Sequence, residues 1–165
     1  MSKNKKIIIG VVVGVIALIL VGLAAFFALK NHKKTPISAD EFYKTCSNKG
    51  YEMVDSVDQY DSIFGEGVVE ESYIALGENH QIEFLDFADA DDAVRVYKGE
   101  EEYLETLKGS GSASTSVSFN SYSKCTLTSN GKYHCVSRIE DTMIYIDIDE
   151  DYKDEVKETV KELGY

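Results

Sequence analysis

The sequence predicts an α+β protein: an N-terminal transmembrane helix followed by one two-layer domain, in which helices cover one face of an antiparallel sheet. Three observations support this fold class. Residues 7–29 form an unbroken apolar run, segments with strand and helix periodicity alternate along the rest of the chain, and short turns separate the strands. After the transmembrane helix, the expected element order is α-βββ-α-βββ-α.

The apolar run, residues 7–29, contains no charged residue and no proline. At about 1.5 Å per residue, a helix of this length spans roughly 34 Å, slightly more than the ~30 Å hydrocarbon core of a bilayer. A cleaved signal peptide has a shorter apolar core, and the best candidate cleavage site, after Ala24, would fall inside this run. We therefore expect an uncleaved anchor, and a cleaved signal peptide is the alternative.

Lysines flank the apolar run on both sides, at Lys3, Lys5, Lys6, Lys30, Lys33 and Lys34. Because the flanks are balanced, the positive-inside rule gives only a slight preference, through the α-amino group, for a cytoplasmic N-terminus. We expect a single-pass protein of the cell membrane that contacts lipid through residues 7–29. Its predicted parts are a cytoplasmic tail (1–6), the transmembrane helix (7–29), a juxtamembrane linker (30–37) and an extracytoplasmic domain (38–165).

The predicted extracytoplasmic domain is acidic. All 29 acidic residues but only 11 of the 17 basic residues follow Lys34, which gives this part a net charge of −18. Such a charge repels nucleic acid and attracts cations or basic partners, although it can also serve only to keep the domain soluble. We therefore expect no nucleic-acid partner, and a protein partner at the membrane or cell surface.

The first half of the domain begins with a helix. Ser38 and Glu41 form a capping box, Ile37 and Phe42 occupy the two positions of a hydrophobic staple, and Gly50 provides the C-terminal signal. Alternating apolar residues then predict three strands, over residues 51–57, 68–76 and 81–87.

The second half repeats this order. Aspartates within residues 89–92 offer an N-cap for a helix that continues to Leu107, with a split into two helices at Gly99 as the alternative, and residues 109–116 form a linker of small residues. A final helix begins near Asp149 and ends at Gly164. Between the linker and this helix, strands are expected over residues 117–128, 133–139 and 142–148.

Cys125 and Cys135 are a candidate disulfide pair because they flank a predicted hairpin turn. A three-residue loop over residues 129–131 would place the two cysteines directly opposite each other. A two-residue turn at Asn130-Gly131 would shift the register by one, and the cysteines would then be small apolar residues on a buried face. Cys46 is expected to be a buried free thiol.

Four acidic residues match positions 1, 3, 5 and 12 of a calcium-binding loop: Asp147, Asp149, Asp151 and Glu158. The match is incomplete because Tyr152 stands where the loop needs glycine, and because the pattern runs from a predicted strand into a predicted helix. We expect at most weak, nonspecific binding of divalent cations, with helix capping and solvation as the alternative roles.

No sequence motif for catalysis or cofactor binding is present. The chain contains no Gly-x-Ser-x-Gly, phosphate loop, dinucleotide-binding fingerprint, zinc-protease helix or CxxC. Paired carboxylates are so abundant that they indicate nothing specific. We therefore predict a protein that is not an enzyme, without a cofactor and without catalytic residues.

The arrangement of a lysine-flanked anchor, a short linker and a small acidic domain resembles small, uncharacterised single-pass proteins of Gram-positive bacteria. The Ser-Ala-Asp-Glu-Phe helix start (residues 38–42) and the Glu-Leu-Gly-Tyr segment (residues 162–165) share this likeness. The resemblance implies a bacterial cell surface, where disulfides are less frequent, and carries no activity with it.

The leading functional prediction is a membrane-anchored extracytoplasmic module that acts by binding a partner. The alternative is an extracytoplasmic sensor or a domain that binds a small ligand or cation, with loops 65–67 and 109–116 as its rims. A cell-surface enzyme is the third possibility.

Overall fold

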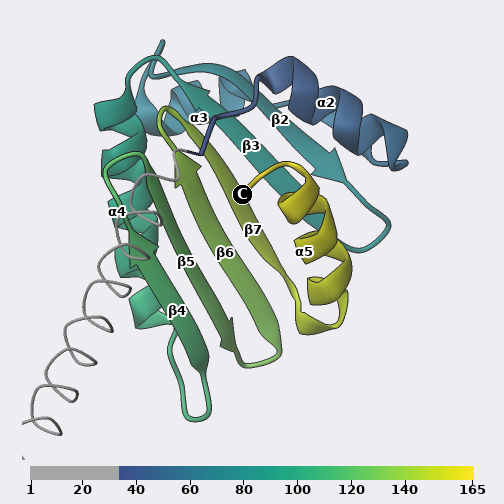
Figure 1. Ribbon diagram of the computed structural model, residues 1–165, viewed down its shortest axis with the longest axis vertical. Coiled ribbons are helices and arrows are strands. Elements are labelled where there is room, and N and C mark those ends of the chain that lie inside the picture. Colours follow the sequence, from purple (N-terminus) through teal and green to yellow (C-terminus); the bar gives the residue numbers. More distant parts are fainter. Residues whose placement is uncertain (1–33) are drawn as a thin grey trace, which may run out of the picture. The chain divides into compact units, whose positions relative to one another are not determined.

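Seven antiparallel strands form one sheet in the computed structural model, which describes residues 34–165 (Figure 1). Their order across the sheet is β1-β2-β3-β7-β6-β5-β4. Because β3 pairs with β7, the two halves of the chain meet in the middle of the sheet. The strands are β1 (Glu52–Asp55), β2 (Val69–Leu76), β3 (Gln81–Phe87), β4 (Ala113–Ser118), β5 (Tyr122–Ser129), β6 (Lys132–Ile139) and β7 (Thr142–Asp149).

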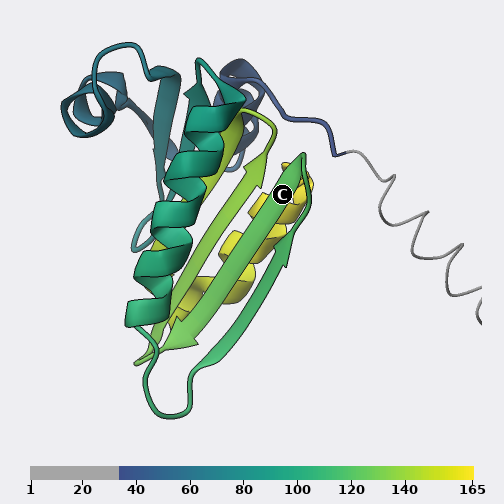
Figure 2. The ribbon, with the colours of Figure 1, turned by 90° about the vertical axis from the view of Figure 1, so that its left-hand side faces the viewer.

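Four α-helices within residues 34–165 cover both faces of this sheet, not one face as predicted (Figure 2). One core lies under α2 (Ala39–Asn48) and α5 (Lys153–Glu162), and the other lies under α3 (Val57–Phe64) and α4 (Ala90–Thr106). The α+β class is confirmed, but the domain has three layers.

The central strands explain the third layer because they are apolar on both faces. On β7, Ile144 and Ile146 belong to the core under α2 and α5, whereas Met143 belongs to the core under α3 and α4. A strand buried on both sides needs helices on both sides. In the first core, Phe42 of α2 stacks on Phe84 of β3, with ring centres 5.0 Å apart.

Two elements were not predicted from the sequence. Helix α3 occupies residues that were expected to be the end of a strand and a loop, and its Tyr60 and Phe64 pack on the sheet one helical turn apart. Strand β4 begins within the predicted linker and ends at Ser118, and a turn after Phe119 separates it from β5, where one strand was predicted over residues 117–128. The observed order is therefore α-β-α-ββ-α-ββββ-α, in place of α-βββ-α-βββ-α.

The β5–β6 hairpin has the two-residue turn Asn130-Gly131, whose φ angles of 52° and 76° fit a type I′ turn. Cys125 therefore pairs with Val136, and the disulfide that a three-residue loop would allow does not form. Cys125 and Cys135 lie in the cores on opposite faces of the sheet.

All three cysteines, including Cys46, are buried free thiols. Burial raises the pKa of Cys46 to about 12 and also raises the pKa of Cys135, so these thiols are protonated at neutral pH.

The predicted transmembrane helix, residues 7–29, lies outside the described residues. None of the helices formed by residues 34–165 is both long and apolar enough to cross a membrane. Residues 34–37, which were expected to be linker, contact the domain. The Lys34 ammonium donates a hydrogen bond to the Gly164 carbonyl at 2.7 Å, and Ile37 packs on the core under α2 and α5.

Candidate functional site

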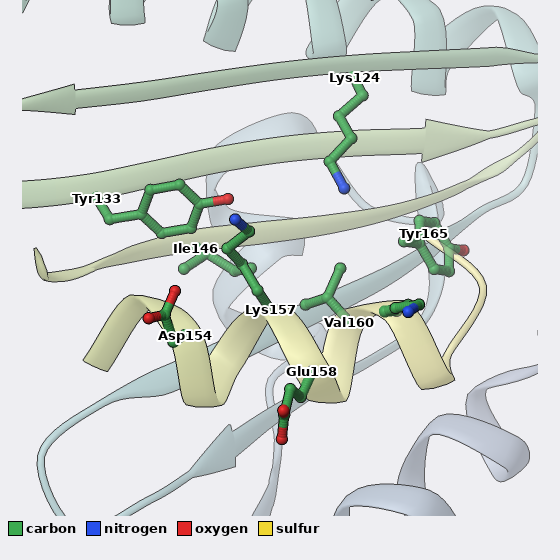
Figure 3. Close-up of a pocket in the computed structure, with 9 residues that line it drawn as sticks. Lys124, Tyr133, Ile146, Asp154, Lys157, Glu158, Val160 and Tyr165 are labelled. Atoms are coloured by element: carbon green, nitrogen blue, oxygen red, sulfur yellow. The ribbon is translucent and has the colours of Figure 1, made fainter. Parts of the chain in front are cut away.

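A groove of about 550 Å³ lies between α5 and the neighbouring strands β5, β6 and β7 (Figure 3). The strands contribute one side and the floor, helix α5 contributes the other side, and Tyr165 closes one end. The lining residues are Lys124, Tyr133, Ile146, Asp154, Lys157, Glu158, Val160, Lys161 and Tyr165.

The groove exists because α5 covers only part of its sheet face. Val156 and Val160 of α5 belong to the core on this face, and Figure 1 shows α5 over the β7 side of the sheet, away from β4 and β5. Along β5, burial alternates, so that Cys125 and Leu127 are buried on the α4 face while Lys124 is only half-buried on the α5 face. The open side of the groove is therefore polar.

Lysines converge on this groove from two elements. Lys153, Lys157 and Lys161 of α5 are four residues apart, so they lie along one side of the helix over about 12 Å. Lys124 of β5 extends towards α5 from the opposite wall, whereas the Glu158 side chain projects away from the strands (Figure 3).

Three of these lysines, Lys124, Lys157 and Lys161, form no ion pair with any residue in the range 34–165. Elsewhere in the domain, lysines readily pair with its many carboxylates, as Lys132 does with Asp149 at 2.7 Å. Like charges four residues apart on a helix repel each other. The groove thus gathers three lysines that have no ion-pair partner among residues 34–165, beside two lining carboxylates, Asp154 and Glu158.

Lys153 and one further lysine, Lys34, lie near the groove without lining it. The Lys153 ammonium donates a hydrogen bond to Thr128 at 3.0 Å and lies 5.3 Å from the centre of the Tyr133 ring. The Lys34 ammonium lies 4.2 Å from the centre of the Tyr122 ring. Burial, and then the nearby charge of Lys124, lowers the pKa of Lys34, so positive charges also crowd each other here.

The tyrosines of the groove add hydrogen-bonding groups that carry no charge. Tyr133 and Tyr165 are almost fully buried, and burial raises the pKa of both phenols. They therefore remain protonated at neutral pH, and Tyr165 hydrogen-bonds with the Thr142 hydroxyl. The groove therefore presents ammonium groups beside largely buried tyrosine rings, which suit an anionic group with an apolar body.

The four acidic residues of the predicted calcium-like loop are not brought together. Asp149 pairs with Lys132, and Asp147 lies 3.5 Å from Nδ1 of His134. Asp151 lies in the 3₁₀ turn η1 (Glu150–Tyr152), and Glu158 lies on α5. Strand β7 continues to Asp149 and a helical turn follows directly, so there is no loop to wrap an ion. Among residues 34–165, no group of three or more His, Cys, Asp or Glu side chains could hold a metal.

The groove was missed in the sequence because its residues come from distant segments. The one available signal was the spacing of the lysines on the last helix, which the overall acidic charge obscured. The loops predicted to be rims of a ligand site, residues 65–67 and 109–116, do not line this groove.

Comparisons with known protein families, with curated proteins and with solved structures found no match. The interpretation of the groove therefore rests on its own chemistry: three lysine ammonium groups, two carboxylates, two largely buried tyrosine rings, and an opening towards solvent.

Proposed function

We propose that this chain is a single-pass membrane protein whose extracytoplasmic domain, residues 38–165, acts as a binding module, with the α5 groove holding an anionic group of its partner. The apolar run at residues 7–29 supports the anchor, and the α-amino group gives the slight preference for a cytoplasmic N-terminus. The resemblance to small single-pass proteins of Gram-positive bacteria supports a cell-surface setting.

One observation carries the binding proposal: Lys124, Lys157 and Lys161 line one groove without an ion-pair partner in the described part of the chain, although the carboxylates of the domain greatly outnumber its lysines. An anion placed between α5 and β5 would relieve the repulsion among these ammonium groups. Lysine acts as a flexible point charge, so the groove can accept phosphate or carboxylate oxygens.

The wider charge of the domain restricts what can bind. A net charge of −18 after Lys34 repels a long polyanion, but at physiological ionic strength this repulsion is screened beyond about 8 Å. A ligand group with one or two anionic centres is compatible with the lysines of the groove and with the acidic surface around them. It contacts the lysines at close range and places little negative charge near the carboxylates of the surface.

Calorimetry on the full-length protein in neutral detergent micelles tests this function, with pyrophosphate and succinate as phosphate and carboxylate probes. We expect saturable binding of at least one probe. Lys157→Gln should weaken that binding about tenfold, the loss of about 1.5 kcal/mol from one charge-assisted hydrogen bond.

Lys98→Gln is the matched control because Lys98 is an exposed lysine of α4, outside the α5 groove. It removes the same charge and should leave the affinity unchanged. Absence of saturable binding for both probes, or equal losses in the Lys157 and Lys98 variants, would contradict the proposal.

A further inference from the structure

A second pocket, of about 250 Å³, lies on the opposite face of the sheet, between α3 and α4 and above β3 and β7. Its walls are mostly apolar and include Phe64, Val96 and Met143. At its mouth, 61% of the Ile63 side chain is exposed to solvent. The pocket is thus an apolar hollow with an apolar lip, separate from the lysine groove.

Two glutamates face this apolar pocket. Glu83 of β3 accepts a hydrogen bond from the Tyr60 hydroxyl on one carboxylate oxygen, and one from the Gln81 amide on the other at 2.7 Å. Glu100 of α4 is half-buried and has no hydrogen bond or ion pair with any residue in the range 34–165.

Glu100 lies close enough to Glu83 to feel its charge. Burial, and then the charge of Glu83, raises the pKa of Glu100. No Lys or Arg side chain lines the pocket. Two neighbouring carboxylates, one of them half-buried, repel each other unless a cation lies between them. A positively charged ligand can supply that cation.

Aromatic rings define the chemistry of that missing cation. Tyr60 and Phe64 stack with ring centres 5.8 Å apart, and Tyr145 lines the same pocket. Aromatic faces attract ammonium groups, and apolar walls favour an aliphatic body over a hydrated metal ion. A volume of about 250 Å³ suits a small organic amine.

We infer that this pocket binds a small aliphatic amine, with the ammonium group against Glu100 and Glu83 and the carbon chain against Phe64, Val96 and Met143. The carboxylates supply the charge, the tyrosines and Phe64 supply ring faces, and Ile63 covers the outer end of the chain. The acidic surface of the domain raises the local concentration of such cations.

Three probes separate charge from apolar contact: hexylamine, which carries both, 1-hexanol, which lacks the charge, and ammonium chloride, which lacks the chain. Binding to the full-length protein in neutral detergent micelles is followed through ¹³C-labelled methionine methyl groups. The chain has three methionines, of which Met143 lines the pocket and Met53 packs in the core on the other face of the sheet.

Hexylamine should shift the Met143 signal saturably and leave the Met53 signal in place. Hexanol and ammonium chloride should each bind at least tenfold more weakly. No saturable Met143 shift up to 10 mM hexylamine, or equal binding of hexanol, would overturn the inference.

Glu100→Gln removes the charge with little change in shape and should weaken hexylamine binding at least fivefold. This variant removes an unpaired, half-buried charge and is expected to fold. Glu102→Gln, an exposed position on the same helix, is the matched control and should bind as the unmodified protein does. Equal losses in both variants would mean that only overall charge matters, and the inference would fail. These outcomes are independent of the α5 groove.

Discussion

At the scale of single residues, Asp86 of β3 shows how the fold holds an acid in unfavourable surroundings. Burial, followed by the charges of Asp141, Glu71 and Glu70, raises the pKa of Asp86 to about 6. In an unfolded chain the pKa of aspartate is about 3.9. The folded protein therefore holds this proton more tightly, and the stability that Asp86 contributes is complete below about pH 4 and is lost as the pH rises through 6.

Asp86→Asn should consequently stabilise the protein at pH 7, because the amide cannot ionise. We expect the free energy of unfolding to rise by about 1–2 kcal/mol, less than the full pKa shift would give, since the side chain keeps some contact with water. The difference should vanish near pH 3.5. Urea unfolding followed by circular dichroism at several pH values measures both effects.

Glu66→Gln provides the control for this experiment because it removes one charge from an exposed loop position. It should change the stability at pH 7 by less than 0.5 kcal/mol, as is usual for exposed sites (~±0.5 kcal/mol). A destabilised Asp86 variant at pH 7, or a gain that persists at pH 3.5, would show that charge is not the cause.

At the scale of elements, the start of α2 was predicted correctly because its signals are local. The Ser38 hydroxyl accepts a hydrogen bond from the Glu41 amide at 3.2 Å, as an N-cap does. Ser38→Ala should therefore lower the free energy of unfolding by about 1 kcal/mol. Ser47→Ala, at an exposed position near the other end of the helix, should cause no loss, and urea titration compares the two variants. Equal stabilities would argue against the cap.

Two glycines should respond to alanine with opposite signs. Gly131 of the β5–β6 turn has a φ of 76°, which an L-residue adopts only at a cost, and Gly131→Ala should destabilise the protein by about 1–2 kcal/mol. Gly99 lies inside α4, where an added Cβ meets nothing within 4 Å, and Gly99→Ala should stabilise by up to about 1 kcal/mol. Thermal melts of the two variants give the signs directly. Changes in the same direction would contradict this reading of the turn.

The elements that were not predicted lack such local signals. Strand β4 is exposed throughout and exists because it pairs with β5, from Ala113 opposite Thr128 to Ser118 opposite Ser123. Helix α3 was hidden because its eight residues carry only a short apolar pattern. Strand β4 and helix α3 form because they pair and pack with distant segments, and the local sequence pattern does not reveal those contacts.

At the scale of the whole molecule, the class of the domain followed from the sequence, but neither of the two proposed binding sites did. The α5 groove joins Lys124 to lysines about thirty residues further along the chain, and the amine pocket combines two helices with two strands. Helix placement on both faces creates these hollows. The sequence predicted helices on one face of the sheet only. A pocket under helices on the other face could therefore not be predicted.

The proposed anchor makes a prediction at the same scale. After carbonate washing and ultracentrifugation, the full-length chain should remain in the membrane pellet, whereas a chain begun at Lys34 should remain in the supernatant. Immunoblotting of both fractions measures this. Protease added to intact cells should digest the domain if it lies outside. An untrimmed full-length chain in the supernatant would refute the anchor, and full protection from protease would reverse the orientation.

The hydrogen bond between Lys34 and the Gly164 carbonyl has a mechanical consequence. Tension applied to the polypeptide before Lys34 loads this hydrogen bond and the contact of Lys34 with the Tyr122 ring before any ladder between strands is sheared. A modest pull would thus release Lys34 from its place beside the lysine groove while the sheet stays intact.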